Sequence, residues 1–384
     1  MLFKDIIGHK EIKQKLINSV KNNRISHAQL FLGKAGTGKL SLAIAYAQYV
    51  ACTNKTDDDS CGVCKSCKKY SKLVHPDLHF VYPVVRTKKF TKPVSSDFLT
   101  EWRTFVLKDK FHSYNDWIET IGTENLQGSI YSQESQEIIK KLTLKTFESE
   151  YKIMIIWMAE KMNVSASNKL LKMIEEPPKK TLFILVVEDE EQIITTIRSR
   201  IQLIKINRLS EKDIADELEQ LFPSAQKALI QDSARIADGS FSVAKKNVEQ
   251  VLDPNIVDGN SKNFELFTSL MRIAYGANVL RLVGWVDDVC KFGREQEKSF
   301  FQYSLRLIRE NFILNITPEN KDQVTFLSDK EYQFSKNFNR FINKNNITNL
   351  YEEFGKAQAD IERNAYDKIV FLDLALKIAQ LLRK

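Results

Sequence analysis

The sequence contains no uninterrupted apolar run of about 18 or more residues, the length that a membrane-spanning helix requires. Its first residues, MLFKDIIGHK, also lack the apolar core of a secretory signal. Both absences argue against a membrane-embedded or secreted protein. We therefore expect a cytoplasmic protein with no membrane partner.

Cysteine is scarce, with five residues in 384, yet four of the five lie within sixteen residues. They follow the pattern Cys-x8-Cys-x2-Cys-x2-Cys and are Cys52, Cys61, Cys64 and Cys67. This spacing lets four thiolates converge on one tetrahedral ion, and the polar loop TNKTDDDS gives the first cysteine the slack to join. We predict a structural zinc site at residues 52–67, because four cysteine ligands leave no open coordination position. A redox dithiol is the alternative use of a Cys-x-x-Cys step.

The composition is that of a folded protein, with 43% hydrophobic and 28% charged residues. A chain of 384 residues exceeds one ordinary hydrophobic core, so we expect about two or three domains. The net charge of +8 would suit nucleic acid or an acidic partner. The lysines are scattered along the chain, however, and a solvated surface explains them equally well. Charge alone therefore identifies no partner.

The stretch LFLGKAGTGKLS, residues 30–41, fits the G-x-x-x-x-G-K part of a phosphate-binding loop. An apolar segment precedes it and an alanine-rich, helix-favouring segment follows, which is the strand–loop–helix context that such a loop needs. A glycine-rich turn with an incidental lysine is the alternative. We predict a degraded nucleotide-binding loop whose phosphate contacts would come from Gly33, Gly36, Thr37, Gly38 and Lys39.

The residue after the loop lysine is wrong for magnesium. The motif requires Ser or Thr there as a Mg²⁺ ligand, but this chain has Leu40, and Ser41 comes one residue late. Whether ATP or ADP occupies the loop is therefore left open by the sequence, and we expect no Mg²⁺ site.

Two further apolar runs, KIMIIW at 152–157 and TLFILVV at 181–187, are typical of buried parallel strands. Strands that alternate with helices around a phosphate loop predict a three-layer α/β sandwich with a parallel sheet. We also expect a short strand at 129–131. An ATPase of this kind needs an acidic pair at the end of the 152–157 strand. Trp157 and Met158 stand there instead, with Glu160 two residues later.

Residues 81–124 form an insertion that mixes basic residues with aromatic ones, including Trp102 and Trp117. Aromatic side chains among lysines could stack on single-stranded nucleic acid. Helical spacing within the insertion favours the other interpretation, in which the aromatic side chains are buried against the host domain.

The chain changes character after Ile206 and becomes helical. We predict an α/β phosphate-loop domain at 1–206, a small helical domain at 207–253 and a further helical domain at 254–384. A linker is expected at 254–261, and helices at 264–274, 300–312 and 366–382. The last domain shows no catalytic grouping, and its helices would serve subunit assembly or packing within the monomer.

Several strings together resemble the AAA+ module of bacterial DNA polymerase III clamp-loader subunits. They are FKDIIGHKEIKQKL, HAQLFLGKAGTGK, the four cysteines, HPD, NKLLKMIEEPP and TIRSR. The resemblance covers residues 1 to about 250, and it is closest to the delta prime type. It implies that residues 1–206 are an AAA+ P-loop domain, 207–253 a helical lid domain and 254–384 a helical collar or oligomerisation domain. In the ATPase type, gamma or tau, the phosphate loop ends in Lys-Ser or Lys-Thr and the acidic pair is present.

The resemblance implies a subunit of a hetero-pentamer with delta and gamma or tau subunits, which loads a sliding clamp onto primed DNA as part of a DNA polymerase holoenzyme. It also implies that Arg200, after Ser199 in TIRSR, acts in trans as an arginine finger on the ATP of a neighbouring subunit. Departures from the ATPase pattern at Leu40, at Trp157 with Met158, at Val187 with Glu188, and at Ser242 predict no ATP hydrolysis by this chain.

Two other functions remain as alternatives. The chain could be an active AAA+ ATPase, gamma- or tau-like, that works through unusual residues such as Glu160 or Glu188. It could instead be a zinc-dependent nucleic-acid-binding module that uses Trp102 and Trp117 of the insertion to stack bases.

Overall fold

The structure is a computed structural model that describes residues 1–88, 90–122, 126–253, 259–317 and 326–383. The chain divides into two compact units, Met1–Lys245 and Lys246–Lys384. The finer division into three domains stays a prediction. No helix within the described ranges is long and apolar enough to cross a membrane.

The first unit is organised around a parallel sheet with strand order β2-β3-β4-β1-β5. Its five strands are β1 Ala28–Leu32, β2 Leu78–Val81, β3 Lys152–Trp157, β4 Thr181–Val187 and β5 Gln202–Lys205. Strands β3 and β4 are buried along their whole length, which explains why both read as continuous apolar runs. The predicted short strand at 129–131 is wrong, because Ser129 and Ile130 form only isolated bridges, with Val84 and Met162.

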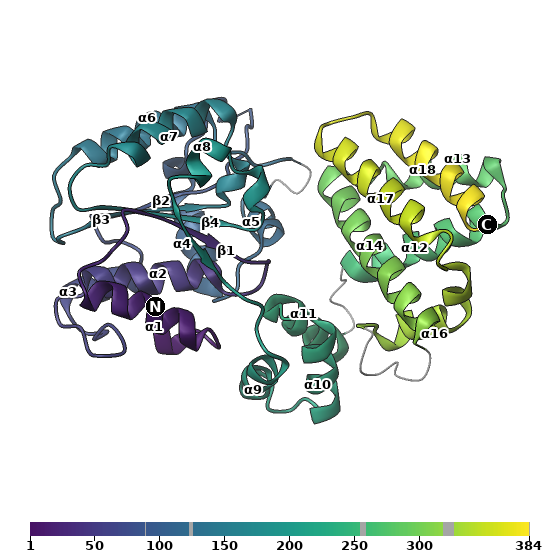
Figure 1. The fold of residues 1–384 in the computed structure, drawn as a ribbon, viewed down its shortest axis with the longest axis horizontal. Helices are drawn as coiled ribbons and strands as arrows, with labels where there is room; N and C mark the ends of the chain where they lie inside the picture. The colour runs from purple at the N-terminus through teal and green to yellow at the C-terminus, as the bar shows by residue number, and fades with distance from the viewer. Residues whose placement is uncertain (89, 123–125, 254–258, 318–325, 384) are drawn as a thin grey trace. The chain divides into compact units, whose positions relative to one another are not determined.

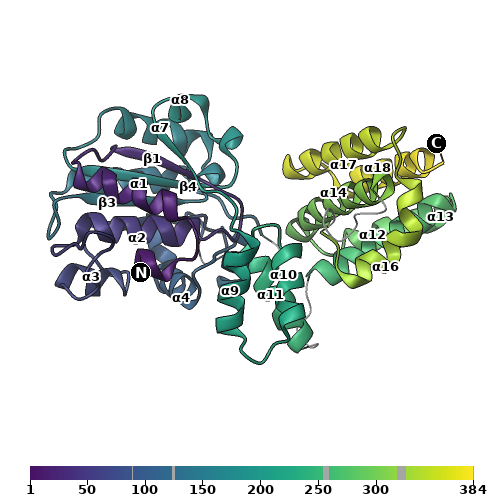
Figure 2. The same ribbon diagram turned by 60° about the horizontal axis from the view of Figure 1, so that its bottom comes forward.

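Helices cover both faces of the sheet, so the predicted three-layer sandwich with a parallel sheet is confirmed (Figures 1 and 2). Side chains alternate along β3, where Ile153 and Ile155 enter one hydrophobic cluster and Met154 and Ile156 enter the other. One layer contains α1 Lys10–Lys21, α2 Lys39–Ala51, α3 Lys65–Tyr70, α4 Leu99–Lys108 and α5 Tyr114–Thr120. The opposite layer contains α6 Ser132–Thr143, α7 Val164–Glu175 and α8 Thr195–Arg198.

The first unit continues from β5 into helices α9 Glu211–Leu221, α10 Lys227–Ile236 and α11 Phe241–Leu252, the last of which crosses the division between the two units. Ser210 caps α9, because its hydroxyl oxygen accepts a hydrogen bond from the Asp213 N–H at 3.0 Å. Gly239 turns the chain between α10 and α11 with a φ of +80°, and a Cβ there would lie 2.4 Å from the Cβ of Arg208.

The second unit is helical throughout its described residues and has its own hydrophobic core. Its helices are α12 Gly259–Tyr275, α13 Val279–Val289, α14 Arg294–Ile316, α16 Asp329–Phe338, α17 Ile347–Glu362 and α18 Asp367–Leu381. The three helices predicted here lie within α12, within α14, and over α18 with one residue beyond each of its ends. Residues 254–258 of the predicted linker lie outside the described residues, and its last three residues already belong to α12.

Candidate functional site

The phosphate loop lies at the carboxyl end of the sheet, between β1 and α2. Gly33 begins it, and the Gly33 N–H donates to the carbonyl of Val187, at the end of β4, at 3.1 Å. Gly36 and Gly38 have φ values of +73° and +78°, which glycine adopts without strain. Parallel strands end at the same edge, so the residues after β3 and β4 are brought beside this loop.

Lys39, the loop lysine, is 3% exposed and forms an ion pair with Glu188, the residue that follows β4. The Lys39 Nζ to Glu188 Oε1 distance is 2.8 Å, and Nζ also donates to the carbonyl of Lys34 at 3.2 Å. The ammonium that a phosphate-binding loop presents to its ligand is therefore engaged by a carboxylate of the same chain. The sequence showed Glu188 as a departure from the ATPase pattern, but no sequence pattern predicted this ion pair.

Glu160 lies beside the ion pair of Lys39 and Glu188. Its Oε1 accepts a hydrogen bond from the Glu188 N–H at 2.8 Å. Burial, with a further contribution from the Glu188 charge, raises the pKa of Glu160 to about 7. Two carboxyl groups and one ammonium thus occupy the place where an ATPase would hold nucleotide and metal.

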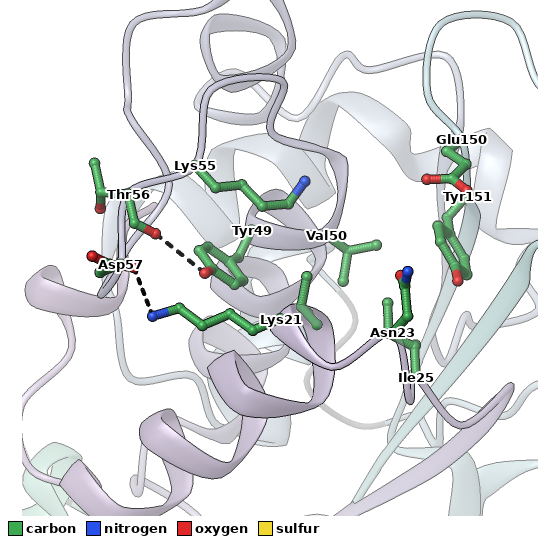
Figure 3. A pocket seen from close by; sticks show the side chains of 11 residues that line it. Lys21, Asn23, Ile25, Tyr49, Val50, Lys55, Thr56, Asp57, Glu150 and Tyr151 are labelled. Carbon is green, nitrogen blue, oxygen red and sulfur yellow. Dashed lines mark hydrogen bonds and ion pairs between the residues drawn. The ribbon is translucent and has the colours of Figure 1, made fainter.

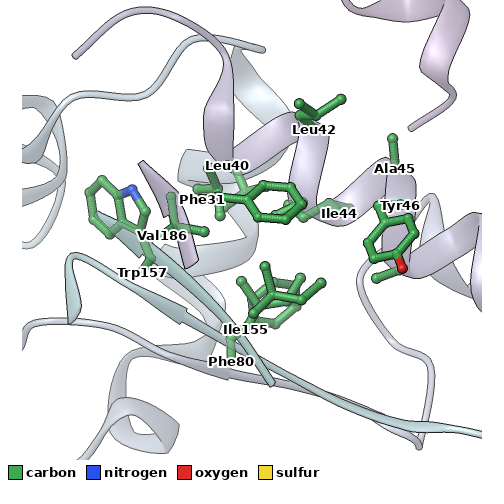
Figure 4. Packing of buried hydrophobic residues seen from close by; sticks show 14 of the residues in the cluster. Phe31, Leu40, Leu42, Ile44, Ala45, Tyr46, Phe80, Ile155, Trp157 and Val186 are labelled. Atoms are coloured by element: carbon green, nitrogen blue, oxygen red, sulfur yellow. The ribbon is translucent and has the colours of Figure 1, made fainter. Parts of the chain in front are cut away.

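The positions that would bind Mg²⁺ face the core instead. Leu40 is buried in the hydrophobic cluster beneath α2 (Figure 4). Ser41 is also buried, and its hydroxyl donates to the carbonyl of Lys110 at 2.5 Å, so it is not directed into the loop. Trp157 and Met158, which replace the acidic pair, belong to the same hydrophobic cluster.

Residues of the following helical segment cover the loop from outside. The Phe241 N–H donates to the carbonyl of Gly36 at 2.9 Å. A Cβ at Gly36 would lie 2.1 Å from the Ser240 hydroxyl and 2.3 Å from that of Ser242, so these hydroxyl groups sit directly over the loop backbone. His9 adds a contact between its Nε2 and the carbonyl of Thr37 at 2.8 Å.

The four clustered cysteines are brought together as the spacing predicts. Their Sγ atoms all lie within 4.8 Å of one another. Three separations are 3.6 Å for Cys52 to Cys61, 4.0 Å for Cys52 to Cys64, and 3.9 Å for Cys61 to Cys67. A tetrahedral zinc with Zn–S bonds of about 2.3 Å requires separations of about 3.8 Å. The donor set therefore fits zinc.

Backbone groups support the same sulfur atoms. N–H groups donate from Cys61 to Cys52 Sγ at 3.4 Å, from Cys64 to Cys61 Sγ at 3.3 Å, and from Cys67 to Cys64 Sγ at 3.4 Å. Burial raises the pKa of the Cys64 thiol, but hydrogen bonds led by the Cys67 N–H outweigh it and lower the pKa to about 5. These bonds orient the sulfurs and favour the thiolate form that a metal needs.

Arg200 follows α8 at the surface, with 43% of its side chain exposed. Its Nε pairs with Glu175 Oε1 at 2.7 Å, and its Nη1 donates to the carbonyl of Thr196 at 2.9 Å and to the Ser199 hydroxyl at 3.2 Å. The guanidinium is thus positioned but accessible. Its role as an arginine finger stays a prediction.

The aromatic side chains of the 81–124 insertion are buried. Trp102 and Trp117 have 0% exposure, and the Trp102 ring stacks on Tyr82 with centroids 4.0 Å apart. The Trp117 Nε1 donates to the carbonyl of Pro83 at 2.7 Å. The alternative in which these two tryptophans stack on nucleic acid is therefore wrong, because neither ring can reach a base.

A surface pocket of about 300 Å³ lies apart from the loop, and none of the predicted site residues lines it (Figure 3). Four of its lining residues contact each other. Lys21 forms an ion pair with Asp57 at 2.9 Å, and the Tyr49 hydroxyl donates to the carbonyl of Thr56 at 3.2 Å.

Comparison with known proteins identifies the family. The model of the family described as "DNA polymerase III, delta subunit" matches residues 8–210. The delta prime subunit of DNA polymerase III from Bacillus subtilis is 29% identical over 207 residues, which cover 54% of this chain and 50% of that protein. The tau subunit from the same organism is 26% identical over 254 residues, which cover 65% of this chain and 38% of that protein.

Among solved structures, a gamma subunit-related protein from Thermotoga maritima aligns with 97% of this chain and 99% of its own, at 13% identity and a TM-score of 0.39. In the two sequence comparisons above, the segment matched by this chain spans only half or less of the length of the Bacillus subtilis proteins. Because its family model covers more than half of the sequence, the chain belongs to the DNA polymerase III delta-subunit family, which confirms the resemblance to AAA+ clamp-loader subunits.

Proposed function

We propose that the chain is a delta prime type clamp-loader subunit that does not hydrolyse ATP itself. It would join delta and gamma or tau type subunits in a hetero-pentamer that places a sliding clamp on primed DNA. The observation that carries this proposal is the ion pair between Lys39 and Glu188 at 2.8 Å. A gamma or tau type ATPase needs that ammonium for the nucleotide phosphates.

The surroundings of the ion pair support the same conclusion. Phosphoryl transfer needs a metal bound beside the phosphates and a group that positions the attacking water. Leu40 and Trp157 are buried in the core where these groups would stand. The Ser240 hydroxyl and the Phe241 N–H occupy the outer side of the loop.

Arg200 would be the catalytic contribution of this chain to a neighbouring subunit. An arginine supplied in trans stabilises the charge of the transition state and is worth about a thousandfold or more in rate. Its position supports the role, because the contacts with Glu175 and Ser199 hold an exposed guanidinium at the start of the segment between α8 and β5. Because these contacts already hold the arginine in one conformation, its side chain would lose less rotamer entropy when it binds phosphate.

Zinc would hold the N-terminal segment as well as its own loop. Cys52, Cys61, Cys64 and Cys67 would be its ligands, and a four-cysteine zinc contributes folding free energy and no catalysis. Asp59, inside the zinc loop, accepts hydrogen bonds from the N–H groups of Phe3 and Lys4, both at 3.0 Å. The zinc loop therefore fixes the segment that begins the AAA+ domain.

Assembly would use the helical unit. Helices α13 and α18 pack against each other and carry large apolar side chains on their solvent side. Exposed apolar side chains on neighbouring helices are typical of a surface that another subunit covers. The residues are Val279, Leu280, Val283, Ile369 and Leu376, with Leu280 86% exposed.

The test is reconstitution of clamp loading from purified delta, tau and clamp, with and without this chain. The proposal expects a stable complex and ATP-dependent loading only when the chain is present, and no Mg²⁺-dependent ATP turnover by the chain alone. Loading at full rate without the chain would overturn the proposal. Replacing Leu280 by Asp, with Ile316 to Asp as a matched control on another exposed apolar position, should weaken assembly only in the first variant.

A second candidate function, an active ATPase, is favoured by one observation. Burial raises the pKa of Glu160 to about 7, near the value expected of a general base, and its carboxylate lies beside Glu188. ATP turnover by the isolated chain that is lost in both Lys39→Ala and Glu160→Gln would establish this function in place of the first.

A further inference from the structure

A second group of metal-ligating side chains lies in the helical unit, far along the sequence from the four clustered cysteines. Cys290 ends α13, Glu297 lies in the first turns of α14, and Asp367 is the first residue of α18. One ligand atom from each of these side chains lies within 4.8 Å of the other two. Three helix ends thus direct a thiol and two carboxyl groups at one point.

Glu297 is the unexplained member of this group. It is 1% exposed, and neither of its carboxylate oxygens has a hydrogen-bond partner among the residues that the structure describes. A buried carboxylate without partners is costly, because it loses its hydration and gains nothing in return. The structure therefore has an orphaned acidic group that a cation would satisfy.

Two nearby cations, Arg294 and Lys368, make contacts with other groups. Arg294 donates to the carbonyl of Ile361 at 3.2 Å and to Asn364 Oδ1 at 3.1 Å, which ties the start of α14 to the turn before α18. Lys368 pairs with Asp287 at 2.6 Å. The charges of Arg294 and Lys298 act on Glu297 from a distance, but neither of its carboxylate oxygens has a hydrogen bond to a described residue.

The donor set decides which cation fits. A thiolate selects zinc and similar transition metals over Mg²⁺ or Ca²⁺, which prefer oxygen ligands alone. Cys290 and Asp367 are half-buried, so an ion and a water ligand can enter from the solvent side. Ligands of tetrahedral zinc lie about 3.5 Å apart.

We propose that Cys290, Glu297 and Asp367 form a second metal site, which binds one zinc-class divalent cation through one thiolate and two carboxylates, with water as the fourth ligand. The ion clamps the ends of α13, α14 and α18 and so stabilises the helical unit. The site is independent of nucleotide and of other subunits, and it stands whether or not the proposed clamp-loader role is correct.

The test counts metal in the full-length chain. Metal-free protein is equilibrated with zinc, separated from free ion, and analysed for zinc per chain. Two equivalents are expected for the unaltered chain, one for Glu297→Gln and for Cys290→Ser, and two for the control Asp288→Asn, whose side chain is exposed and pairs with Lys291. One equivalent in the unaltered chain, or two in Glu297→Gln, would overturn the proposal.

Cobalt separates the two sites. In a Cys61→Ser, Cys64→Ser chain, Co²⁺ should still give a thiolate-to-metal absorption band, and Cys290→Ser in that background should abolish it. Absence of the band in the first of these chains, with its far-ultraviolet circular dichroism unchanged, contradicts the proposal. If the double cysteine variant does not fold, zinc counting in the unaltered and Glu297→Gln chains decides the question alone.

Discussion

The ammonium nitrogen of Lys39 lies 2.8 Å from Oε1 of Glu188, and this ion pair occupies the phosphate loop. A nucleotide that binds there must displace a carboxylate from a lysine that is only 3% exposed. Glutamine at position 188 keeps the size of the side chain but removes its charge, which frees the ammonium for an anion.

We therefore predict that Glu188→Gln raises the affinity for ADP by roughly tenfold, equivalent to about 1.4 kcal/mol. The exposed Glu191 provides the control, because Glu191→Gln removes a nearby charge that does not contact the loop lysine. Titration calorimetry measures both. Equal affinities in the unaltered chain and Glu188→Gln would show that the ion pair does not control the site.

The buried carboxyl of Glu160 predicts a pH dependence of stability. Its pKa is raised from 4.5 to about 7, so between these values the folded chain holds a proton that the unfolded chain has lost. The folded state is then favoured at low pH, and this contribution falls as pH rises through the window. Glutamine cannot ionise and still offers an oxygen to the Glu188 N–H.

Glu160→Gln should therefore stabilise the chain at pH 8, by up to about 3 kcal/mol, and have little effect at pH 5. Urea unfolding of the two chains at both pH values gives the difference directly. A stabilisation of equal size at both pH values would contradict the raised pKa.

Loss of the four-cysteine zinc should loosen the N-terminal segment. Cys61→Ser should remove one zinc per chain and lower the Tm of the first unit by about 5 °C or more. Because Asp59 holds the N–H groups of Phe3 and Lys4, residues 1–6 should also lose protection from hydrogen exchange. The control is Lys65→Ser, which changes an exposed side chain of the same segment. If the two variants bind the same amount of zinc, or show the same hydrogen-exchange pattern, this zinc site is ruled out.

Tryptophan fluorescence tests the buried insertion. All four tryptophans are buried, with Trp285 the most exposed at 6%. We expect single-stranded DNA to leave the emission of the isolated chain unchanged, since base stacking requires an accessible ring. Quenching that disappears at high salt would restore the nucleic-acid alternative.

Much of the first unit could be predicted from local pattern. The runs 152–157 and 181–187 are strands because burial on both faces demands continuous apolar sequence. The cysteine spacing likewise predicts the observed convergence of sulfur atoms. The predicted short strand at 129–131 was wrong, because only Ser129 and Ile130 form bridges, and these are isolated. Sequence pattern cannot distinguish isolated bridges from a short strand.

The charges at the loop could not be predicted in the same way. Lys39 and Glu188 are 149 residues apart, and their contact depends on β4 lying next to β1 in the sheet order. Cys290, Glu297 and Asp367 meet for a similar reason, since three helix ends converge only in the folded unit. Contacts of this kind depend on topology, which the local sequence does not specify.

The central claim is that this chain completes the ATPase site of a neighbour and has no ATPase activity of its own. The most direct measurement is ATP turnover by the reconstituted loader with primed DNA and clamp, comparing the unaltered chain with Arg200→Ala and with Arg198→Ala, an exposed arginine two residues away. We predict that Arg200→Ala preserves assembly and lowers turnover at the completed site by about a thousandfold. Arg198→Ala should have no effect, and the isolated chain should be inert. Full turnover in the Arg200→Ala assembly, together with ATP hydrolysis by the isolated chain, would contradict the claim.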